Sequence, residues 1–423
     1  MPRPERRVPT SAARRLARFL VGLRPEDVPP PVTARAALLA LDTLGSCLAS
    51  TRYDFGRAVR ETAERLGGPP ESLLIGGKGR VAAANAALAN ATLAHGLDFD
   101  DTREDAIVHT GSVAVTTALA VGEARGASGR ATLAALIAGV EVMCRIGLAV
   151  PGTFHARHYH PTSLTGSFAA AAVAGKLHGL GEDALVHAFG ICGSQAGGII
   201  EYLADGSWTK RLHPGWAAHA GIVAALLAQS GFTGPETVFE GEHGFYQAFA
   251  GGHDVARLDA LLDSLGRTWE LERLTFKPYP CGSIAHPYMD CALRLRERYR
   301  LAPAEIAKGR AGLAEFEDEA VRDPAVLAVA SRVGYEIDPT IDYPRQFVGH
   351  VRIRTGDGRL LEERQDHPRG GADDPMTREE LEAKFRGNAG LVVPDEQGSR
   401  VIRAVHALAA AASLHGLVES LTP

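Results

Sequence analysis

Cysteine is scarce in this sequence, and several other features are absent. The 423 residues include five cysteines and no C-x-x-C pair, which argues against a disulfide framework and favours a reducing, cytoplasmic location. No apolar run reaches the roughly 20 residues that a membrane span needs. The formal net charge of −5 and the lack of a continuous basic stripe argue against a nucleic-acid partner. The Arg-rich start (residues 1–20) lacks the apolar core of a secretory signal, so we expect an ordinary tail before a first helix.

Helical spacing of small apolar residues is abundant instead. Residues 11–23 place apolar side chains such as Leu16 and Leu20 on one face, with arginines opposite. Residues 32–49 are apolar almost all round, which indicates a central helix. A similar Ala-, Gly-, Val- and Leu-rich pattern returns at residues 81–95, 112–125, 131–149, 163–177 and 215–229. Small side chains let helix backbones approach closely, so we expect a tightly packed multi-helix domain.

The pattern changes near Arg267. Residues 284–299 read as an amphipathic helix, and residues 351–364 read as two strands around a turn that contains Asp357 and Gly358. Thr377 and Glu380 form a capping box that opens another helix, and one Ala-rich helix at about 400–417 follows. We therefore predict a mainly α fold. It comprises an all-helical domain at residues 1–265, completed by 396–423, and a smaller α/β domain at 266–395.

Residues 91–112, ATLAHGLDFDDTREDAIVHTGS, concentrate ionisable groups at the junction of two predicted helices. Buried charge must be paired, hydrogen-bonded or neutralised, so such a stretch either caps helices or performs chemistry. Its polar residues are His95, Asp98, Asp100, Asp101, Thr102, Asp105 and His109.

Three further motifs place polar side chains at the ends of predicted elements. His160 precedes a small-residue helix, and Lys210 and His213 precede a helix that we expect to open at Pro214. Lys277 lies between a strand-like run and a helix. Helix N-termini present free N–H groups and a partial positive charge, which hold carboxylates. The motifs together indicate a pocket for a small molecule with more than one carboxylate.

Each of these residues also has a plainer interpretation. Any one of Asp98, Asp100 and Asp101 could simply cap a helix or pair with a surface arginine. A lone histidine such as His95 is more often a core or surface residue than a functional one, and Lys210 beside Arg211 would usually be solvated. The recurrence of similar polar groups at four element ends favours the joint interpretation.

The motifs AHGLDFDDT with HTGS, HYHPTS, LADGSWTKRLHPGWAAHAG and FKPYPCGSIAH, in this order, resemble the MmgE/PrpD family. That family includes 2-methylcitrate dehydratase, cis-aconitate decarboxylase and iminodisuccinate epimerase. The resemblance implies a large helical domain, a smaller α/β lid domain, a homodimer, and an active site between the domains without metal or cofactor. This chain departs from the family at Thr110, at Gly282 and Ser283, and after about Arg310, where a shortened lid is expected.

Carried over position by position, the resemblance points to six site residues. Lys210 and Lys277 are expected to bind the substrate carboxylates and to stabilise a carbanion as it develops. His109 and His160 are the acid and base candidates, in an order left open, because imidazole titrates near working pH. Asp98 would tune a neighbouring histidine or lysine, and Thr102 would hydrogen-bond the substrate.

The resemblance implies a cofactor-independent lyase that acts on a small di- or tricarboxylic acid. Loss of water, as in 2-methylcitrate dehydratase, comes first, with cis-aconitate decarboxylase-like or iminodisuccinate epimerase-like activity as alternatives. Two other classes stay open: a catalytically impaired paralogue with an incomplete lid, and a Mg²⁺-dependent terpenoid synthase that uses the aspartates. Against the synthase, no second metal-binding motif follows on a later helix.

Overall fold

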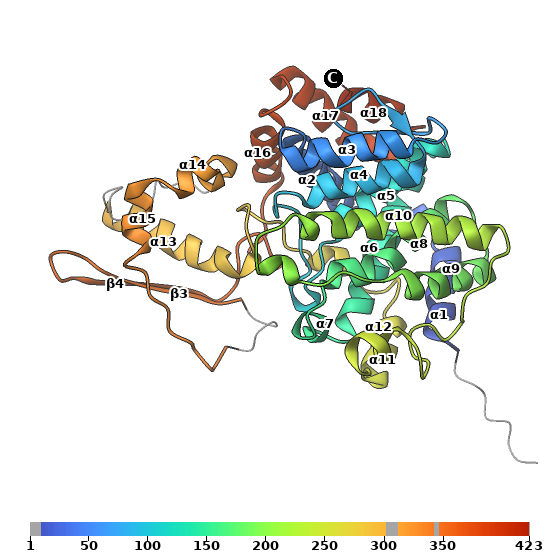
Figure 1. The fold of residues 1–423 in the computed structure, drawn as a ribbon, viewed down its shortest axis with the longest axis horizontal. Coiled ribbons are helices and arrows are strands. Elements are labelled where there is room, and N and C mark those ends of the chain that lie inside the picture. Colours follow the sequence, from blue (N-terminus) through green and yellow to red (C-terminus); the bar gives the residue numbers. More distant parts are fainter. Residues whose placement is uncertain (1–9, 302–311, 342–346, 423) are drawn as a thin grey trace, which may run out of the picture.

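The computed structural model describes residues 10–301, 312–341 and 347–422, and helices make up most of them (Figure 1). The mainly helical fold class is thereby confirmed. The first ten helices are α1 (Ala12–Gly22), α2 (Pro30–Ser50), α3 (Asp54–Leu66), α4 (Ala83–His95), α5 (Thr110–Ala124), α6 (Gly129–Leu148), α7 (Thr153–Ala156), α8 (Pro161–Leu177), α9 (Glu182–Gln195) and α10 (Thr209–Gln229).

The remaining elements include both short hairpins of the described residues. The later helices are α11 (Phe245–Ala250), α12 (Val255–Asp263), α13 (His286–Tyr299), α14 (Asp318–Val321), α15 (Pro324–Ala330), α16 (Arg378–Ala389), α17 (Asp395–His406) and α18 (His415–Leu421). The strands pair antiparallel as β1 (Ser72–Leu73) with β2 (Arg80–Val81), and β3 (Gly349–Arg354) with β4 (Leu360–Gln365).

Small residues determine how closely the central helices pack. Helices α4, α5, α6 and α8 are buried over most of their length and α10 along one face, and these helices pack together in the middle of the molecule (Figure 1). A methyl group added at Gly221 of α10 would come within 2.3 Å of the carbonyl oxygen of Ser167 in α8. The close approach predicted from the Ala- and Gly-rich pattern is therefore present. We call helices α1–α12, together with α16–α18 that pack on them, the helical body.

Helix α10 begins earlier than expected. It starts at Thr209, so Lys210 and His213 lie in its first turns and Pro214 lies inside the helix. A proline in a helix removes one backbone hydrogen bond, here the one that would run to the carbonyl of Lys210. Packing of α10 against α4 and α8 holds the helix together through this position. The prediction that the helix opens at Pro214 is wrong.

The C-terminal region contains two helices, α17 and α18, where one was predicted. Ala411 between them has extended backbone angles. Its carbonyl oxygen accepts a hydrogen bond of 3.0 Å from the N–H of Gly129 at the start of α6. The chain leaves the helical path to make this contact, and α17 packs against α2 of the helical body.

A smaller unit formed by α13, β3 and β4 projects from the helical body (Figure 1). Its hairpin is the predicted strand pair, with Gly358 at a positive φ of 86° in the turn. Its core is small, and Leu295, Leu301 and Leu361 form its buried apolar cluster. The expected shortening after about Arg310 falls at residues 302–311, outside the described residues.

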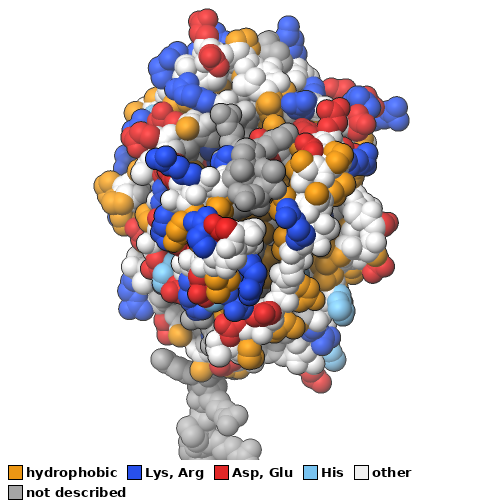
Figure 2. Space-filling model, turned by 90° about the vertical axis from the view of Figure 1, so that its left-hand side faces the viewer, with side chains coloured by type: hydrophobic (Ala, Val, Ile, Leu, Met, Phe, Trp, Pro, Cys, Tyr) orange, Lys and Arg blue, Asp and Glu red, His pale blue; other side chains and the backbone are white. Residues whose placement is uncertain are grey.

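The surface of the smaller unit is mixed in charge. In the view of Figure 2, Lys and Arg side chains alternate with Asp and Glu side chains, with apolar side chains between them. Helix α16, which the sequence analysis places in the smaller domain, packs instead on α2 of the helical body. The predicted capping box at its start is present, since the Glu380 carboxylate accepts from the Thr377 N–H at 2.7 Å.

Helices α2 and α6 are long and apolar enough, by length and composition alone, to cross a membrane. Their apolar windows are 78% and 94% buried inside the protein. Their position as core helices accounts for that composition.

Candidate functional site

The aspartate stretch between α4 and α5 brings two lysines from distant parts of the chain to one carboxylate. Asp98 has a positive φ of 52°, a left-handed conformation that is uncommon for residues other than glycine. Its Oδ1 lies 2.8 Å from Nζ of Lys210 and 2.7 Å from Nζ of Lys277. The Asp98 carbonyl oxygen also accepts from Lys277 at 3.0 Å.

The electrostatics of this trio keep Asp98 and Lys277 charged at neutral pH. Burial acts to raise the pKa of Asp98, but Lys210 and Lys277 outweigh it and hold that pKa well below its ordinary value. Burial acts to lower the pKa of Lys277, and Asp98 and Asp100 outweigh it, so the pKa is raised. Asp98 therefore already shows how these two ammonium groups hold a carboxylate.

His109 and His160 occupy equivalent positions, directly before the first turns of α5 and α8. The backbone N–H of His109 donates to Oγ1 of Thr162 at 3.1 Å, which links the two helix starts. The His109 ring donates from Nδ1 to the carbonyl oxygen of Asp101 at 2.8 Å. The neutral ring therefore has its Nε2 free as an acceptor.

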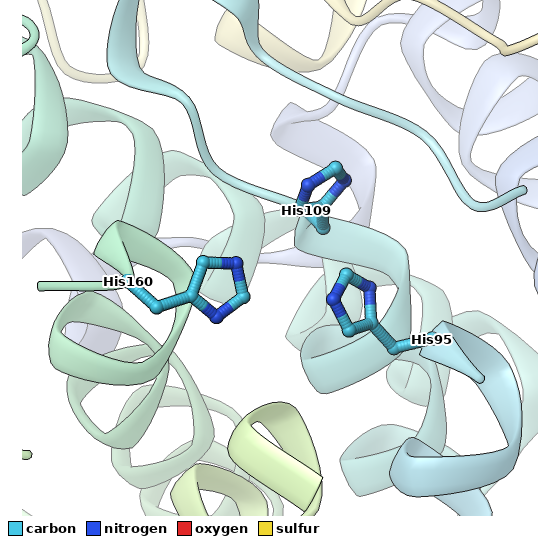
Figure 3. Close-up of side chains that lie close together, drawn as sticks. All are labelled: His95, His109 and His160. Carbon is cyan, nitrogen blue, oxygen red and sulfur yellow. The ribbon is translucent and has the colours of Figure 1, made fainter. Parts of the chain in front are cut away.

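A third ring, from His95 at the end of α4, lies beside these two and forms a triangle with them (Figure 3). Its centroid is 4.8 Å from that of His109 and 5.4 Å from that of His160. His95 was treated in the sequence analysis as an ordinary lone histidine. Its Nδ1 contacts the Asp100 carboxylate at 2.9 and 3.1 Å, which identifies it as part of the site.

His213 adds a fourth ring from the side of α10. Its Nδ1 lies 3.0 Å from Nδ1 of His160. Burial lowers the pKa of His109 to about 3 and that of His213 to about 4, and burial with the neighbouring positive groups lowers the pKa of His160 well below its usual value. These three imidazoles are therefore neutral at pH 7. We call the whole set the histidine–lysine cluster: His95, Asp98, Asp100, His109, His160, Lys210, His213 and Lys277.

Asp101 caps a helix, which is the plainer interpretation that the sequence analysis gave for it. Its carboxylate accepts from the N–H of Thr110 at 3.1 Å and from the N–H of Gly111 at 2.7 Å, and so caps the start of α5. Burial and the neighbouring Asp100 raise its pKa to about 7.

Thr102 lies beside the cluster and is tied into it through its backbone. Its N–H donates to the Thr275 carbonyl at 2.9 Å, and the Thr275 N–H donates back at 2.8 Å. This bridge fixes the segment that carries Lys277 two residues later. The side chain of Thr102 is buried, and its expected hydrogen bond to substrate stays a prediction.

Lys384 of α16 is a neighbour that the sequence analysis missed. Its Nζ lies 2.6 Å from Oδ1 of Asp42 in α2 and donates to the Phe99 carbonyl at 2.7 Å. Burial lowers the pKa of Lys384 and raises that of Asp42. Through its bond to the Phe99 carbonyl, Lys384 holds the aspartate stretch in place. It lies in a helix with many charged residues, so the sequence gave no sign of this role.

Most of the cluster is shielded from solvent. Lys277 and Asp100 are fully buried, and His95, His109 and His160 nearly so, whereas the side chains of Lys210 and Asp98 are 24% and 31% exposed. Solvent therefore reaches the cluster from the side of these two residues. Two surface hollows, of about 370 and 590 Å³, lie elsewhere and are lined by none of its residues.

The donor atoms could be considered for a metal ion. One ring nitrogen from each of His95, His109 and His160 lies within 4.8 Å of the others. However, the ammonium groups of Lys210 and Lys277 reach the adjoining Asp98, and two fixed positive charges oppose a cation there. The arrangement suits a small anion and acid–base chemistry better than a divalent ion.

Comparison with known proteins gives a consistent family match. Residues 14–258 match the model of the MmgE/PrpD N-terminal domain, and residues 305–410 match that of the MmgE/PrpD C-terminal domain. A "Cis-aconitate decarboxylase-like protein oryM" of Aspergillus oryzae is 24% identical, covering 95% of both chains. The cis-aconitate decarboxylase of Homo sapiens is 26% identical, covering 91% of this chain and 89% of its own. That of Aspergillus terreus is 24% identical over 89% of this chain and 88% of its own.

Proposed function

This chain belongs to the MmgE/PrpD family, and from that premise we propose that it is a lyase that releases CO₂ from a small unsaturated tricarboxylic acid of the cis-aconitate type. The sequence analysis put dehydration first and decarboxylation second. The names of the relatives favour the second. Within the structure, one observation carries the proposal: a carboxylate, that of Asp98, is held by two lysines beside three converging imidazoles.

The substrate of this type has three carboxylates and one C=C bond. In the proposed reaction the carboxylate on the saturated carbon leaves as CO₂, and its bonding electron pair stays on the substrate as an allylic carbanion. That charge is delocalised across the double bond toward the far carboxylate. A proton then bonds to the far carbon, which leaves an unsaturated dicarboxylate with the double bond moved.

Lys210 and Lys277 fit the carbanion-stabilising part of this reaction. Their ammonium groups converge on one oxygen of Asp98, so a substrate carboxylate placed beside Asp98 would meet both charges at once. Preorganised positive charge in a site of low water content stabilises developing negative charge strongly, and removal of one such donor costs about 10²- to 10³-fold in rate. Lys277 is fully buried, so little water surrounds its ammonium group.

The state of His109 and His160 in the free enzyme fits a role in binding the substrate. Burial keeps both rings neutral at pH 7, so each can donate or accept a hydrogen bond without adding charge. Both rings stand at helix N-termini, whose partial positive charge also favours a bound carboxylate. We assign them to substrate binding and orientation around the reacting carbons.

The proposal is tested with a panel of citrate-like and aconitate-like acids. We expect CO₂ release from cis-aconitate and, in D₂O, one deuterium on the new saturated carbon of the product by NMR. Loss of water from a hydroxy tricarboxylate, seen as a rise in ultraviolet absorbance without CO₂, would replace decarboxylation by dehydration. We expect full activity after EDTA treatment, and activity lost to EDTA and restored by Mg²⁺ would contradict the cofactor-independent reaction.

A further inference from the structure

Two neighbouring carboxylates in the aspartate stretch do different things. Asp101 bonds backbone N–H groups of α5, whereas Asp100 bonds the ring of His95 through both oxygens, at 2.9 and 3.1 Å from Nδ1. Asp100 is fully buried and His95 is 1% exposed. Burial acts to raise the pKa of Asp100, but His95 and His109 outweigh it and lower the pKa, so this carboxylate is ionised at neutral pH. A buried carboxylate that accepts from Nδ1–H fixes the orientation of an imidazole and stabilises its protonated form.

The other end of the His95 ring faces the centre of the cluster. Its Nε2 is buried and has no hydrogen-bond partner within the described residues. Figure 3 shows the ring of His95 turned toward those of His109 and His160. A buried polar atom without a partner costs free energy, so an atom left in this state at the centre of a polar cluster indicates a ligand that completes it. The charged and titratable groups that face His95 are Asp98, Asp100, His109, His160 and His213, with Lys210 and Lys277 behind Asp98.

Within the described residues, neither neighbouring ring has a carboxylate at hydrogen-bond distance, although Oδ1 of Asp100 lies 3.8 Å from Nδ1 of His109. His109 donates from Nδ1 to a neutral backbone carbonyl, and His160 meets another imidazole, that of His213. A neutral partner orients a ring but does not compensate a positive charge on it. Among the three converging rings, His95 is the one whose partner offsets the charge of an imidazolium.

We propose that His95, oriented and charge-compensated by Asp100, is the residue that delivers the proton to the substrate carbon. This inference rests on the proposed function. As CO₂ departs, the electron pair of the broken C–C bond forms the allylic carbanion, and the Nε2–H of the His95 imidazolium transfers its proton to the far carbon. His95 becomes neutral with Nδ1–H still bonded to Asp100. Water that enters after product release returns one proton to Nε2, so each turnover consumes one proton and releases one CO₂.

The test compares Asp100→Asn with Asp101→Asn, two neighbouring buried aspartates changed in the same way. Asp100→Asn and His95→Gln should each lower kcat by about 10²- to 10⁴-fold, the usual contribution of positioned proton transfer. Asp101→Asn should lower Tm by weakening the α5 cap and should cost the folded enzyme less than about tenfold in kcat. Equal losses of kcat in the two aspartate variants, or a rate for Asp100→Asn within threefold of wild type, would overturn the proposal.

A second measurement does not depend on turnover. In ¹⁵N NMR of the free protein, Nδ1 of His95 should carry a proton in wild type, because Asp100 accepts from it whether or not Nε2 is also protonated. In Asp100→Asn the side-chain amide can donate to Nδ1, which leaves the proton on Nε2, as expected when a carboxylate partner is lost. The conservative variant Asp100→Glu should restore the wild-type tautomer and part of the rate. A wild-type ring without a proton on Nδ1 would contradict the assignment.

Failure of the proposed function and failure of this inference are distinguishable in D₂O. If no acid of the panel releases CO₂, exchange of carbon-bound hydrogen for deuterium in a bound tricarboxylate still reports proton transfer to carbon. Exchange that disappears in His95→Gln would retain His95 as the donor and remove decarboxylation. Exchange that persists in His95→Gln would remove His95, and the absence of both CO₂ release and exchange in wild type would overturn both proposals.

Discussion

The helical body and the smaller unit differ in how they use charge. In the helical body, ion pairs such as Lys384–Asp42 and Lys277–Asp98 are largely or fully enclosed and converge on one cluster. In the smaller unit, Arg294 and Arg298 meet Glu363 at the surface, around a core of few apolar residues. The segment of Lys277 also belongs to the helical body, since its neighbour Phe276 lies in the main core. Within the described residues, the candidate site therefore lies in the helical body.

The largest effect is expected from variants that remove candidate site residues of the helical body. Lys210→Met and His160→Ala should each lower kcat for CO₂ release by at least about 10²-fold. Lys210→Met removes a positive charge that stabilises the developing carbanion, and His160→Ala removes a ring that orients the substrate. Arg298→Met in the smaller unit is the matched control and should retain the rate. Full activity in either cluster variant would remove that residue from the mechanism.

The same contrast explains what the sequence could and could not predict. Helical periodicity located the central helices, and the motifs around Asp98, His160, Lys210 and Lys277 lie together in the structure because each stands at an element end that faces one point. The part played by His95 could not be read from spacing, since its partner Asp100 also fits a helix cap. The Nδ1 contact of His213 with His160 depends on how far α10 extends before Pro214, and local sequence rules predict a break there.

The free energy of unfolding gives a second test of the comparison, with one variant in each unit that removes a positively charged side chain. Lys384→Met should lower the free energy of unfolding by about 3–5 kcal/mol, because it leaves the buried Asp42 carboxylate without its charge partner. Arg298→Met should cost about 0–1 kcal/mol, because its side chain is 55% exposed and water screens the pair. Urea unfolding at pH 7 measures both. Similar costs for the two variants would show that burial does not separate the two units.

The dependence of stability on pH tests the burial of His286, the first residue of α13 in the smaller unit. Burial lowers the pKa of His286 to about 3, below the ordinary value of 6.5. The folded state therefore binds fewer protons than the unfolded state between these values. The contribution of His286 is complete above pH 6.5 and is lost as pH falls toward 3, by about 1.4 kcal/mol per pH unit.

His286→Gln isolates this contribution from those of other groups. Between pH 6.5 and 4.5 the wild-type protein should lose about 2–3 kcal/mol more than the variant. Asp101 and Glu104, whose pKa values burial raises to about 7, act in the opposite direction and cancel in the difference between the two proteins. Parallel stability curves for the two proteins would show that His286 is not held neutral by burial.

The smallest effect is expected at residues 331–341, the described segment after α15, which exposes apolar side chains. Tyr335 and Ile337 are 91% and 84% exposed, so the double variant Tyr335→Ser, Ile337→Ser should change the free energy of unfolding by less than about 0.5 kcal/mol. Leu361→Ala, which opens the small core itself, is the control and should cost about 2 kcal/mol or more. A large effect of the double variant would mean that these side chains are covered in solution, and its dependence on protein concentration would identify a second copy as the cover. This segment would then be stabilised in part by association with a second copy.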